Sequence, residues 1–211
     1  MPVDGPLYPV NLVLRGRPCL VVGGGSVAFD KVRGLLDGGA VVHVVAPVVD
    51  AGIKALDGVT WEERSYRRGE VQEYRLAVAA TDDALINEAV FLDGEEAGVW
   101  VNAADDPAHC SFTMPARVRR GPLLVTVSTG GHSPALARWL RRRFEAEIGP
   151  EYEDLLELLG EERSERKASG APTQSLDWQS ALDSGMLDLI REGRLAEARE
   201  ALRACLSSSS G

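Results

Sequence analysis

The architecture follows from one segment, Cys19-Leu20-Val21-Val22-Gly23-Gly24-Gly25-Ser26-Val27-Ala28. Four apolar residues in a row are typical of a parallel strand that is buried on both faces. Residues 26–37 are then expected to form a helix, which Gly38-Gly39 ends. Residues 40–46 form a second, Val-rich strand that Pro47 closes. The sequence therefore predicts a βαβ unit whose first turn is rich in glycine.

The same alternation continues along the chain. Strands are predicted at residues 76–80 and 99–104, a helix at 84–93, and a weaker strand at 61–66. Strands that alternate with helices at this spacing predict a doubly wound parallel sheet of the Rossmann type, an α/β fold.

The pattern changes after Asp106-Pro107. Residues 111–115 and 123–129 are expected to be extended and to pair antiparallel, because only a short basic turn at 119–121 separates them. Ser133-Pro134 then predicts a capped helix start, and from residue 149 the chain is expected to be helical and acidic. This predicts a Rossmann domain at 1–110, an extended segment at 111–148 and a small helical domain at 149–211.

Composition narrows the function classes. The chain has 211 residues, 45% of them apolar, which is typical of a globular protein. No run of 18 apolar residues and no secretory signal is visible, so we expect a cytoplasmic protein that does not span a membrane. Cys19, Cys110 and Cys205 form no CxxC pair, which argues against a disulfide framework and against a zinc site. We expect no resident metal.

The charge is unevenly distributed. The net charge of -9 argues against a nucleic-acid partner. Residues 111–144, however, hold seven arginines and no acidic residue, so this segment carries +7 and the rest of the chain -16. Such segregation predicts a local site for an anionic molecule. The structural alternative is that these arginines are solvated on a helix or pair with acidic residues elsewhere.

The glycines fit a dinucleotide-binding turn of the form G-x-G-x-x-A. Gly23 would allow the tight turn, Gly25 would let the backbone approach a pyrophosphate, and Ala28 would let the helix pack closely on the sheet. Gly24 completes the turn, and backbone N–H groups with the helix dipole would hold the phosphates. The alternative is a turn that uses glycine for structural reasons alone.

One feature of such sites is missing. An acidic residue usually ends the second strand and binds the ribose hydroxyls, but this strand ends in Val44-Val45-Ala46-Pro47-Val48. No arginine is present there to bind a 2′-phosphate, so NAD is favoured over NADP. Thr81-Asp82-Asp83 lies at the carboxyl end of a later strand, where such folds bind ligands, and it can also cap the next helix.

Several motifs, taken together, resemble the siroheme synthase dehydrogenase family. They occur in the order known for that family and span residues 7–147, two thirds of the chain. The motifs are Leu7-Tyr8-Pro9, Gly23-Gly24-Gly25-Ser26-Val27-Ala28, Ala79-Ala80-Thr81-Asp82-Asp83 with Asn87, Val101-Asn102-Ala103-Ala104-Asp105, Ser111-Phe112-Thr113-Met114-Pro115-Ala116 and Ser128-Thr129-Gly130-Gly131-His132-Ser133-Pro134-Ala135-Leu136-Ala137.

The resemblance implies a reaction. Members of the family oxidise precorrin-2 to sirohydrochlorin with NAD⁺, and some also insert Fe²⁺ to give siroheme; larger relatives carry a methyltransferase domain for which this chain is too short. The carboxylates of the tetrapyrrole substrate would explain the arginines, since Arg–carboxylate contacts are charge-assisted. The residues expected to bind substrate are Arg117, Arg119, Arg120 and Arg138. The family's central segment also implies a homodimer that covers the exposed strand edges.

Site residues are carried over by the same matching. Asp105 would be the general base or would orient a pyrrole N–H, and its alternative is a turn role. His109 and His132 are candidates for deprotonating the macrocycle, and their alternative is simple exposure at a loop. The residues expected to line the NAD pocket, besides the glycines, are Ser26, Val27, Pro47, Val48, Thr81 and Asn102.

Two other functions fit parts of the sequence. A Rossmann module that senses NAD(H) without catalysis would have no need of Asp105 or of a polyanion site. Another small-molecule dehydrogenase would commonly carry an acidic ribose ligand and a Tyr-x-x-x-Lys or His/Asp catalytic set, and neither is visible. Whether iron or another metal is inserted is left open by the sequence.

Overall fold

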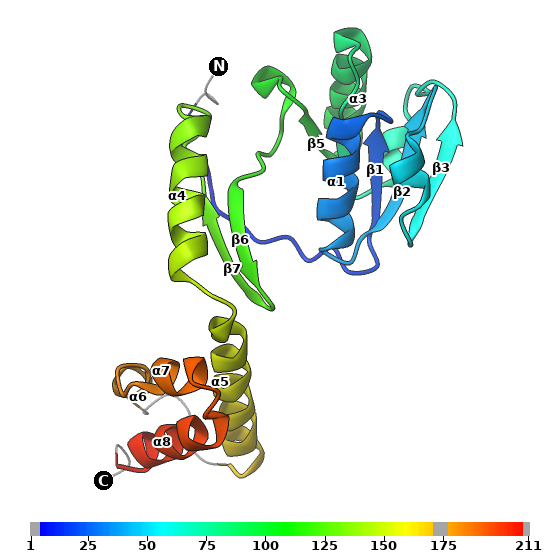
Figure 1. The fold of residues 1–211 in the computed structure, drawn as a ribbon. Coiled ribbons are helices and arrows are strands. Elements are labelled where there is room, and N and C mark those ends of the chain that lie inside the picture. The colour runs from blue at the N-terminus through cyan, green and yellow to red at the C-terminus, as the bar shows by residue number, and fades with distance from the viewer. Residues whose placement is uncertain (1–4, 171–176, 209–211) are drawn as a thin grey trace. The chain divides into compact units, whose positions relative to one another are not determined.

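A computed structural model describes residues 5–170 and 177–208 (Figure 1). The chain folds into two compact units. The first contains the described residues up to Met114 together with Gly130–Ser133. The second contains Pro115–Thr129 and the described residues from Pro134 onward.

A five-stranded parallel sheet forms the centre of the first unit, with strand order β3-β2-β1-β4-β5. The strands are β1 (Pro18–Val22), β2 (Val41–Ala46), β3 (Val59–Glu63), β4 (Leu76–Ala79) and β5 (Trp100–Ala103). β1 is central and almost wholly buried, as its continuous apolar run predicted. The predicted doubly wound α/β fold is therefore confirmed, and the observed strands begin or end within a few residues of the predicted bounds.

Helices cover both faces of this sheet. They are α1 (Ser26–Leu36), α2 (Ala51–Lys54) and α3 (Ala84–Ala97), with the 3-10 helices η1 (Glu70–Glu73) and η2 (Pro107–His109). Ala28, Val32 and Leu35 of α1 pack into one apolar core with alternate residues of β1 and β2. Val90 of α3 and Val71 of η1 pack into a second core on the opposite face.

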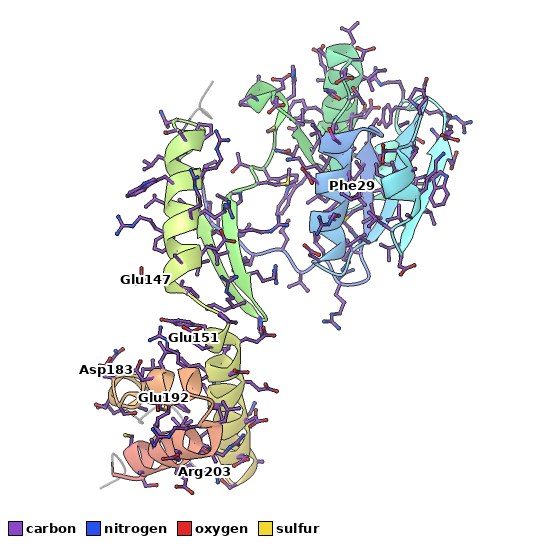
Figure 2. All side chains as sticks on the ribbon, viewed as in Figure 1. Phe29, Glu147, Glu151, Asp183, Glu192 and Arg203 are labelled. Carbon is purple, nitrogen blue, oxygen red and sulfur yellow. The ribbon has the colours of Figure 1, made fainter. Side chains whose placement is uncertain are left out.

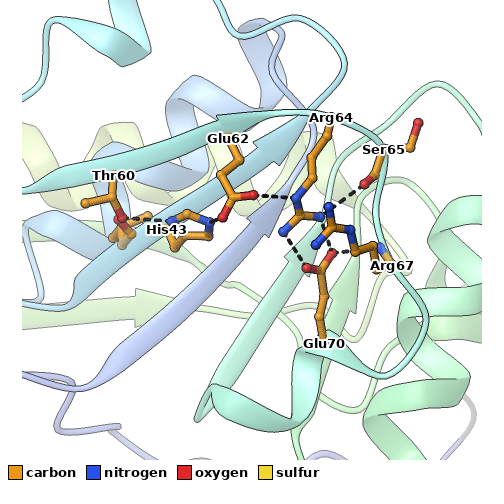
Figure 3. Close-up of polar contacts among 8 residues, drawn as sticks. His43, Thr60, Glu62, Arg64, Ser65, Arg67 and Glu70 are labelled. Atoms are coloured by element: carbon orange, nitrogen blue, oxygen red, sulfur yellow. Dashed lines mark hydrogen bonds and ion pairs between the residues drawn. The ribbon is translucent and has the colours of Figure 1, made fainter.

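A polar network joins β2 and β3 to η1 (Figure 3). The Nδ1 atom of His43 on β2 lies 2.8 Å from Thr60 Oγ1 on β3. Arg64 binds both Glu62 and Glu70, and its NH1 group donates to Glu70 Oε1 at 3.0 Å. These contacts tie β2, β3 and η1 together at one edge of the sheet.

A β-hairpin opens the second unit. It pairs β6 (Ala116–Arg120) with β7 (Leu123–Val127) antiparallel, with Val118 opposite Val125. The turn is Gly121-Pro122, with Gly121 at φ +51, which suits a two-residue hairpin turn with glycine first.

This hairpin corrects the sequence prediction. We expected residues 111–115 to be the first strand and 119–121 to be the turn. Instead, Ser111 is bound back to β5, since its backbone N–H donates to the Val101 carbonyl at 2.8 Å. The strand therefore begins only at Ala116, and Arg119 and Arg120 lie within it.

The rest of the second unit, where the structure describes it, is helical, with α4 (Pro134–Glu147), α5 (Glu151–Ala168), α6 (Trp178–Leu182), α7 (Met186–Arg191) and α8 (Leu195–Ser208). α4 packs along the hairpin (Figure 1). α5 to α8 share a third apolar core that includes Leu158, Met186 and Leu202. Arg203 on α8 (Figure 2) donates to the buried Glu162 of α5 at 3.0 Å. The C-terminal region is helical, as predicted, and the predicted domain bounds of 1–110, 111–148 and 149–211 stay predictions.

Candidate functional site

The glycine turn lies at the point where the strand order reverses. β1 is followed along the chain by β2 on one side, whereas β4 lies on its other side. In open α/β sheets, ligands bind at the carboxyl ends of the strands at such a switch point. The register confirms the geometry, because Val22, the last residue of β1, pairs with Val45 and with Ala79.

Each glycine of the turn has a different environment. Gly23 has φ +129, and a Cβ there would lie 2.2 Å from the Ala80 carbonyl oxygen. A Cβ on Gly24 would lie 2.0 Å from the Val48 carbonyl oxygen. A Cβ on Gly25 would meet nothing within 4 Å. The first two glycines are thus needed for close backbone packing, while the third faces open space.

The start of α1 offers unused backbone donors. Gly25 is the N-cap and no side chain caps the helix, so the first N–H groups, those of Ser26 and Val27, lack a capping partner among the described residues. Both residues are exposed, and Ala28 is fully buried against the sheet. Free N–H groups and the positive end of the helix dipole suit a phosphate. These observations fit the pyrophosphate of a dinucleotide.

The loop after β2 borders the same turn. Pro47 and Val48 are exposed, and the Asp50 backbone N–H donates to the Gly24 carbonyl at 2.9 Å. Glu63 ends β3 in register with Ala46 and accepts a hydrogen bond from the Val49 N–H at 3.2 Å. Glu63 thus brings a carboxylate to the strand edge where the usual acidic residue of β2 is missing. Its hydrogen bond from Lys54 lowers the pKa of the Glu63 carboxyl.

Thr81 follows β4 and uses its hydroxyl within the protein. Its Oγ1 lies 2.8 Å from Oδ1 of the buried Asn87 and accepts a hydrogen bond from the Asp83 N–H. Asp83 caps α3 by accepting from the Leu85 N–H at 2.9 Å. The capping role that the sequence left open is therefore present. The predicted contact between Thr81 and the cofactor stays a prediction.

Asp105 lies in a turn just beyond β5. It is exposed and is the one residue other than glycine with a positive φ, 61, in the described ranges. The backbone N–H of Ala104 donates to the Ala79 carbonyl at 2.8 Å, and Ala80 is the residue that packs against Gly23. Asp105 and the glycine turn thus lie at the same carboxyl edge of β1, β4 and β5.

Asn102, at the end of β5, makes its side-chain contacts within the protein. It is buried, and its Nδ2 donates to the Phe112 carbonyl at 2.9 Å and to Cys110 Sγ at 3.3 Å. The geometry thus favours a role in holding the 103–112 loop. Cofactor contact by Asn102 stays a prediction.

The two histidines have different surroundings. His109 Nδ1 lies 2.6 Å from Asp106 Oδ2, and the ring packs edge-on against Phe91 of α3. The hydrogen bond from His109 lowers the pKa of the Asp106 carboxyl. His132 is exposed beside Gly130. Their catalytic roles stay predictions, and the contacts of His109 also anchor the Asp105 loop to α3.

The arginines of the second unit divide into two groups. Arg117 and Arg119 are exposed on one side of β6, opposite the buried Val118. Arg120 instead donates from Nε to the Ile148 carbonyl at 2.9 Å and from NH2 to the Glu145 carbonyl at 3.0 Å. A cation there complements the C-terminal end of α4. These contacts give Arg120 a structural role at the end of α4, and its predicted role in substrate binding stays a prediction.

Arg138 lines a shallow open depression on α4 together with Ala135, Arg141 and Arg142. Arg141 is paired with Glu145 at 2.8 Å. Arg138 and Arg142 thus border the same surface of α4, and guanidinium groups can bind carboxylates.

Sequence reasoning missed three residues that shape this region. Glu63 lies on a strand that was predicted only weakly, and Asp50 marks the cap of a four-residue helix. The sequence assigns no role to Cys110, yet its thiol bonds to the loop that carries Asp105. An Asp or Glu next to a strand end is a signal for the first two, whereas the contacts of Cys110 depend on the tertiary fold.

Comparison with known proteins gives matches over both units. The family described as putative NAD(P)-binding matches residues 10–116, just over half of the chain. The family described as sirohaem biosynthesis protein central matches residues 120–147. Within residues 5–170 and 177–208, every helix is too short or too polar to span a lipid bilayer.

Relatives match over nearly the whole chain. The siroheme synthase of Nitrosococcus oceani is 39% identical over 203 residues, which are 94% of this chain and 43% of the relative. The siroheme synthase of Azotobacter vinelandii is 38% identical over 201 residues, 93% of this chain and 43% of the relative. This chain thus spans less than half the length of these relatives.

A solved structure titled SirC, precorrin-2 dehydrogenase, matches with a TM-score of 0.71 and 26% identity, over 94% of this chain and 100% of that chain. Together with the glycine turn, these matches confirm the resemblance that the motifs predicted. The chain therefore belongs to the siroheme synthase and precorrin-2 dehydrogenase family, and its first unit is an NAD-binding domain.

Proposed function

We propose that this chain oxidises precorrin-2 to sirohydrochlorin with NAD⁺. The observation that carries the proposal is the placement of an exposed carboxyl group, that of Asp105, at the same sheet edge as a glycine turn fit for a dinucleotide. The match to SirC over the full length of that chain supports it. A module that only senses NAD(H) would need no such carboxyl group.

The first unit supplies the cofactor site. The backbone N–H groups of Ser26 and Val27 would hold the pyrophosphate, and the open side of Gly25 would admit it. Pro47 and Val48 would border the adenosine end. Bound NAD⁺ supplies the hydride acceptor. Precorrin-2 loses one hydride to NAD⁺ and one proton to a base, and the products are sirohydrochlorin and NADH.

Asp105 is the group proposed to act on the substrate. In the part of the chain that the structure describes, its side chain has no hydrogen bond or ion pair, and it is exposed at the strand edge. A carboxyl group so placed can accept the proton or orient a pyrrole N–H of the macrocycle.

The arginines of the second unit are proposed to bind the substrate carboxylates. Arg119 and Arg138 are exposed, and Arg138 borders the depression on α4. Guanidinium–carboxylate contacts are charge-assisted and can be bidentate. Salt should weaken such exposed contacts by screening.

The surface of α4 supports a proposal about assembly. α4 buries only Ala137 of its side chains, whereas Leu136 is 46% exposed and Trp139 is 48% exposed. Exposed apolar side chains on one helix support a homodimer. We also propose a cytoplasmic enzyme. Sedimentation that gives a monomer at micromolar concentration would contradict the homodimer.

The test of the reaction is to incubate the protein with precorrin-2 and NAD⁺ and to record the spectra of sirohydrochlorin and NADH. The proposal expects both products to appear together in equal amounts. An NAD(H) sensor would bind the nucleotide, as a fluorescence titration would show, and leave the tetrapyrrole spectrum unchanged.

Insertion of Fe²⁺ is a separate proposal, supported by the name siroheme synthase that the relatives carry. Fe²⁺ would be a substrate in this reaction. The test supplies sirohydrochlorin and Fe²⁺ without NAD⁺ and follows siroheme formation above the rate without protein. A rate equal to that of the solution reaction would exclude chelation.

A further inference from the structure

Two side chains to which the proposed reaction assigns no step, Asn102 and Cys110, hold the loop that carries Asp105. Asn102, at 8% exposure, donates through Nδ2 to the Phe112 carbonyl at 2.9 Å and to Cys110 Sγ at 3.3 Å. Asn102 thus joins β5 to the far end of the 103–112 loop. An antiparallel bridge between Asn102 and Cys110 fixes the same register.

The Cys110 thiol reaches both sides of the Asp105 turn. Its Sγ lies 3.2 Å from the Ala103 carbonyl oxygen and 3.2 Å from the Asp106 carbonyl oxygen. These two residues bracket Asp105, and the Asp106 N–H closes the turn by donating to the Ala103 carbonyl at 3.3 Å. Burial raises the pKa of the Cys110 thiol, so it keeps its proton and can donate.

Asp105 needs such support because its own backbone is strained. A non-glycine residue with φ 61 is in the left-handed region, which Asp tolerates better than most residues but which still requires the surroundings to impose it. The Asp105 side chain is exposed and has no bonding partner among the described residues. Its direction is therefore set by the backbone of the turn.

We propose that Cys110, together with Asn102, is a positioning residue that holds the 103–106 turn so that Asp105 presents its carboxyl group to the substrate. The inference rests on the proposed function in one respect, namely that Asp105 acts on the tetrapyrrole. Neither Cys110 nor Asn102 is required to touch substrate or cofactor.

The test compares Cys110→Ala, Cys110→Ser and the control Cys205→Ser, which changes a half-buried thiol of the other unit. A displacement of the Asp105 carboxyl group by about 1 Å in Cys110→Ala should lower kcat by about 10- to 100-fold. The NAD⁺ Kd should change by less than about 2-fold, since the glycine turn is untouched. Cys110→Ser should recover part of the rate because its single hydroxyl hydrogen can still donate to one of the two carbonyls, and the control should match wild type.

A double-mutant cycle separates positioning from general damage. In an Asp105→Ala background, Cys110→Ala should change the residual single-turnover rate by less than about 2-fold, because there is no carboxyl group left to position. A thiol that only stabilised the fold would lower the rate in both backgrounds equally. That equal loss would overturn the proposal.

Hydrogen exchange gives a readout that does not depend on activity. Cys110→Ala should raise exchange of the Asp106 amide by about 5-fold, as the loss of one ordinary hydrogen bond implies. An unchanged exchange rate of the Asp106 amide would overturn the proposal that Cys110 holds the 103–106 turn. If exchange rises but Asp105→Ala turns over like wild type, Cys110 does hold the turn, and the catalytic role of Asp105 in the proposed function is wrong.

Discussion

Alanine substitutions at Gly23 and Gly25 perturb two halves of the glycine turn that the structure distinguishes. An alanine Cβ at Gly23 would lie 2.2 Å from the Ala80 carbonyl oxygen, at a backbone φ of +129. The unusual φ costs about 1–3 kcal/mol, and the overpacking against the β4 end costs about 1–3 kcal/mol more. The displaced segment also carries the hydrogen bond from Ala80 N–H to the Val22 carbonyl.

Gly23→Ala should therefore reduce the free energy of unfolding by about 4 kcal/mol, as the sum of these two penalties. For a chain of this size such a loss lowers Tm by about 8–16 °C. The effect should be present without NAD⁺, because it arises from packing inside the sheet.

Gly25→Ala should leave stability nearly unchanged and weaken NAD⁺ binding. Its φ of -92 suits alanine, and the Cβ would meet nothing within 4 Å. The weaker N-cap lowers the free energy of unfolding by about 0.5–1 kcal/mol. The reduced conformational freedom of the unfolded chain raises it by about 0.4–1 kcal/mol, so Tm should barely change. The new methyl group would block the approach of the pyrophosphate. Loss of one or two charged hydrogen bonds, about 3 kcal/mol, raises the NAD⁺ Kd by about 100-fold.

Thermal unfolding by circular dichroism and NAD⁺ titration by fluorescence measure the two effects on the same samples. A Gly25→Ala variant that binds NAD⁺ as wild type does would refute the placement of the pyrophosphate at the start of α1. A Gly23→Ala variant with unchanged Tm would refute the packing argument, because the close approach to Ala80 would then be incorrect.

Three further outcomes are expected. Asp105→Ala should lower turnover by at least about 100-fold while the NAD⁺ Kd stays constant; full activity would remove its assigned role. Arg119→Ala should raise KM for precorrin-2 more at low than at high salt. Arg120→Ala should lower Tm at every salt concentration because Arg120 caps α4. If both variants changed KM and Tm in the same way, the assignment of Arg119 to substrate binding and of Arg120 to the helix end would be wrong. Burial alone would raise the pKa of the Asp93 carboxyl, but the hydrogen bond from Arg68 and two others lower it below 3.8. This contribution to stability is present above pH 3.8 and is lost as the pH falls through the lower folded-state pKa. The Tm of Asp93→Asn should therefore fall less than that of wild type between neutral and strongly acid pH. The same fall of Tm in both proteins would contradict this role of Asp93.

Most of the first unit could be predicted from local sequence. β1 is a continuous apolar run followed by glycines, so its position and the start of α1 could both be predicted. The same holds for the glycine turn, because its three residues are adjacent in sequence. Local patterns succeed in this region since the strand, the turn and the helix are formed by neighbouring residues.

The hairpin and the loop before it show where local patterns fail. Ser111 resembles a strand residue, but its N–H binds Val101 of β5, ten positions away. Arg120 resembles an anion-binding residue, but it caps a helix whose end lies 28 positions further along the chain. Cys110 belongs to no sequence motif that marks it, and it acquires its two carbonyl contacts only when the turn folds. Such contacts depend on tertiary packing.

The central claim is that a dinucleotide held at the glycine turn oxidises a tetrapyrrole beside Asp105. Single-turnover mixing of wild-type protein, NAD⁺ and precorrin-2 tests it most directly. The claim predicts equal yields of NADH and sirohydrochlorin with wild type and neither product with Gly25→Ala at an NAD⁺ concentration well below the Kd of that variant. Sirohydrochlorin formed without NADH, or formed equally by both proteins, would contradict it.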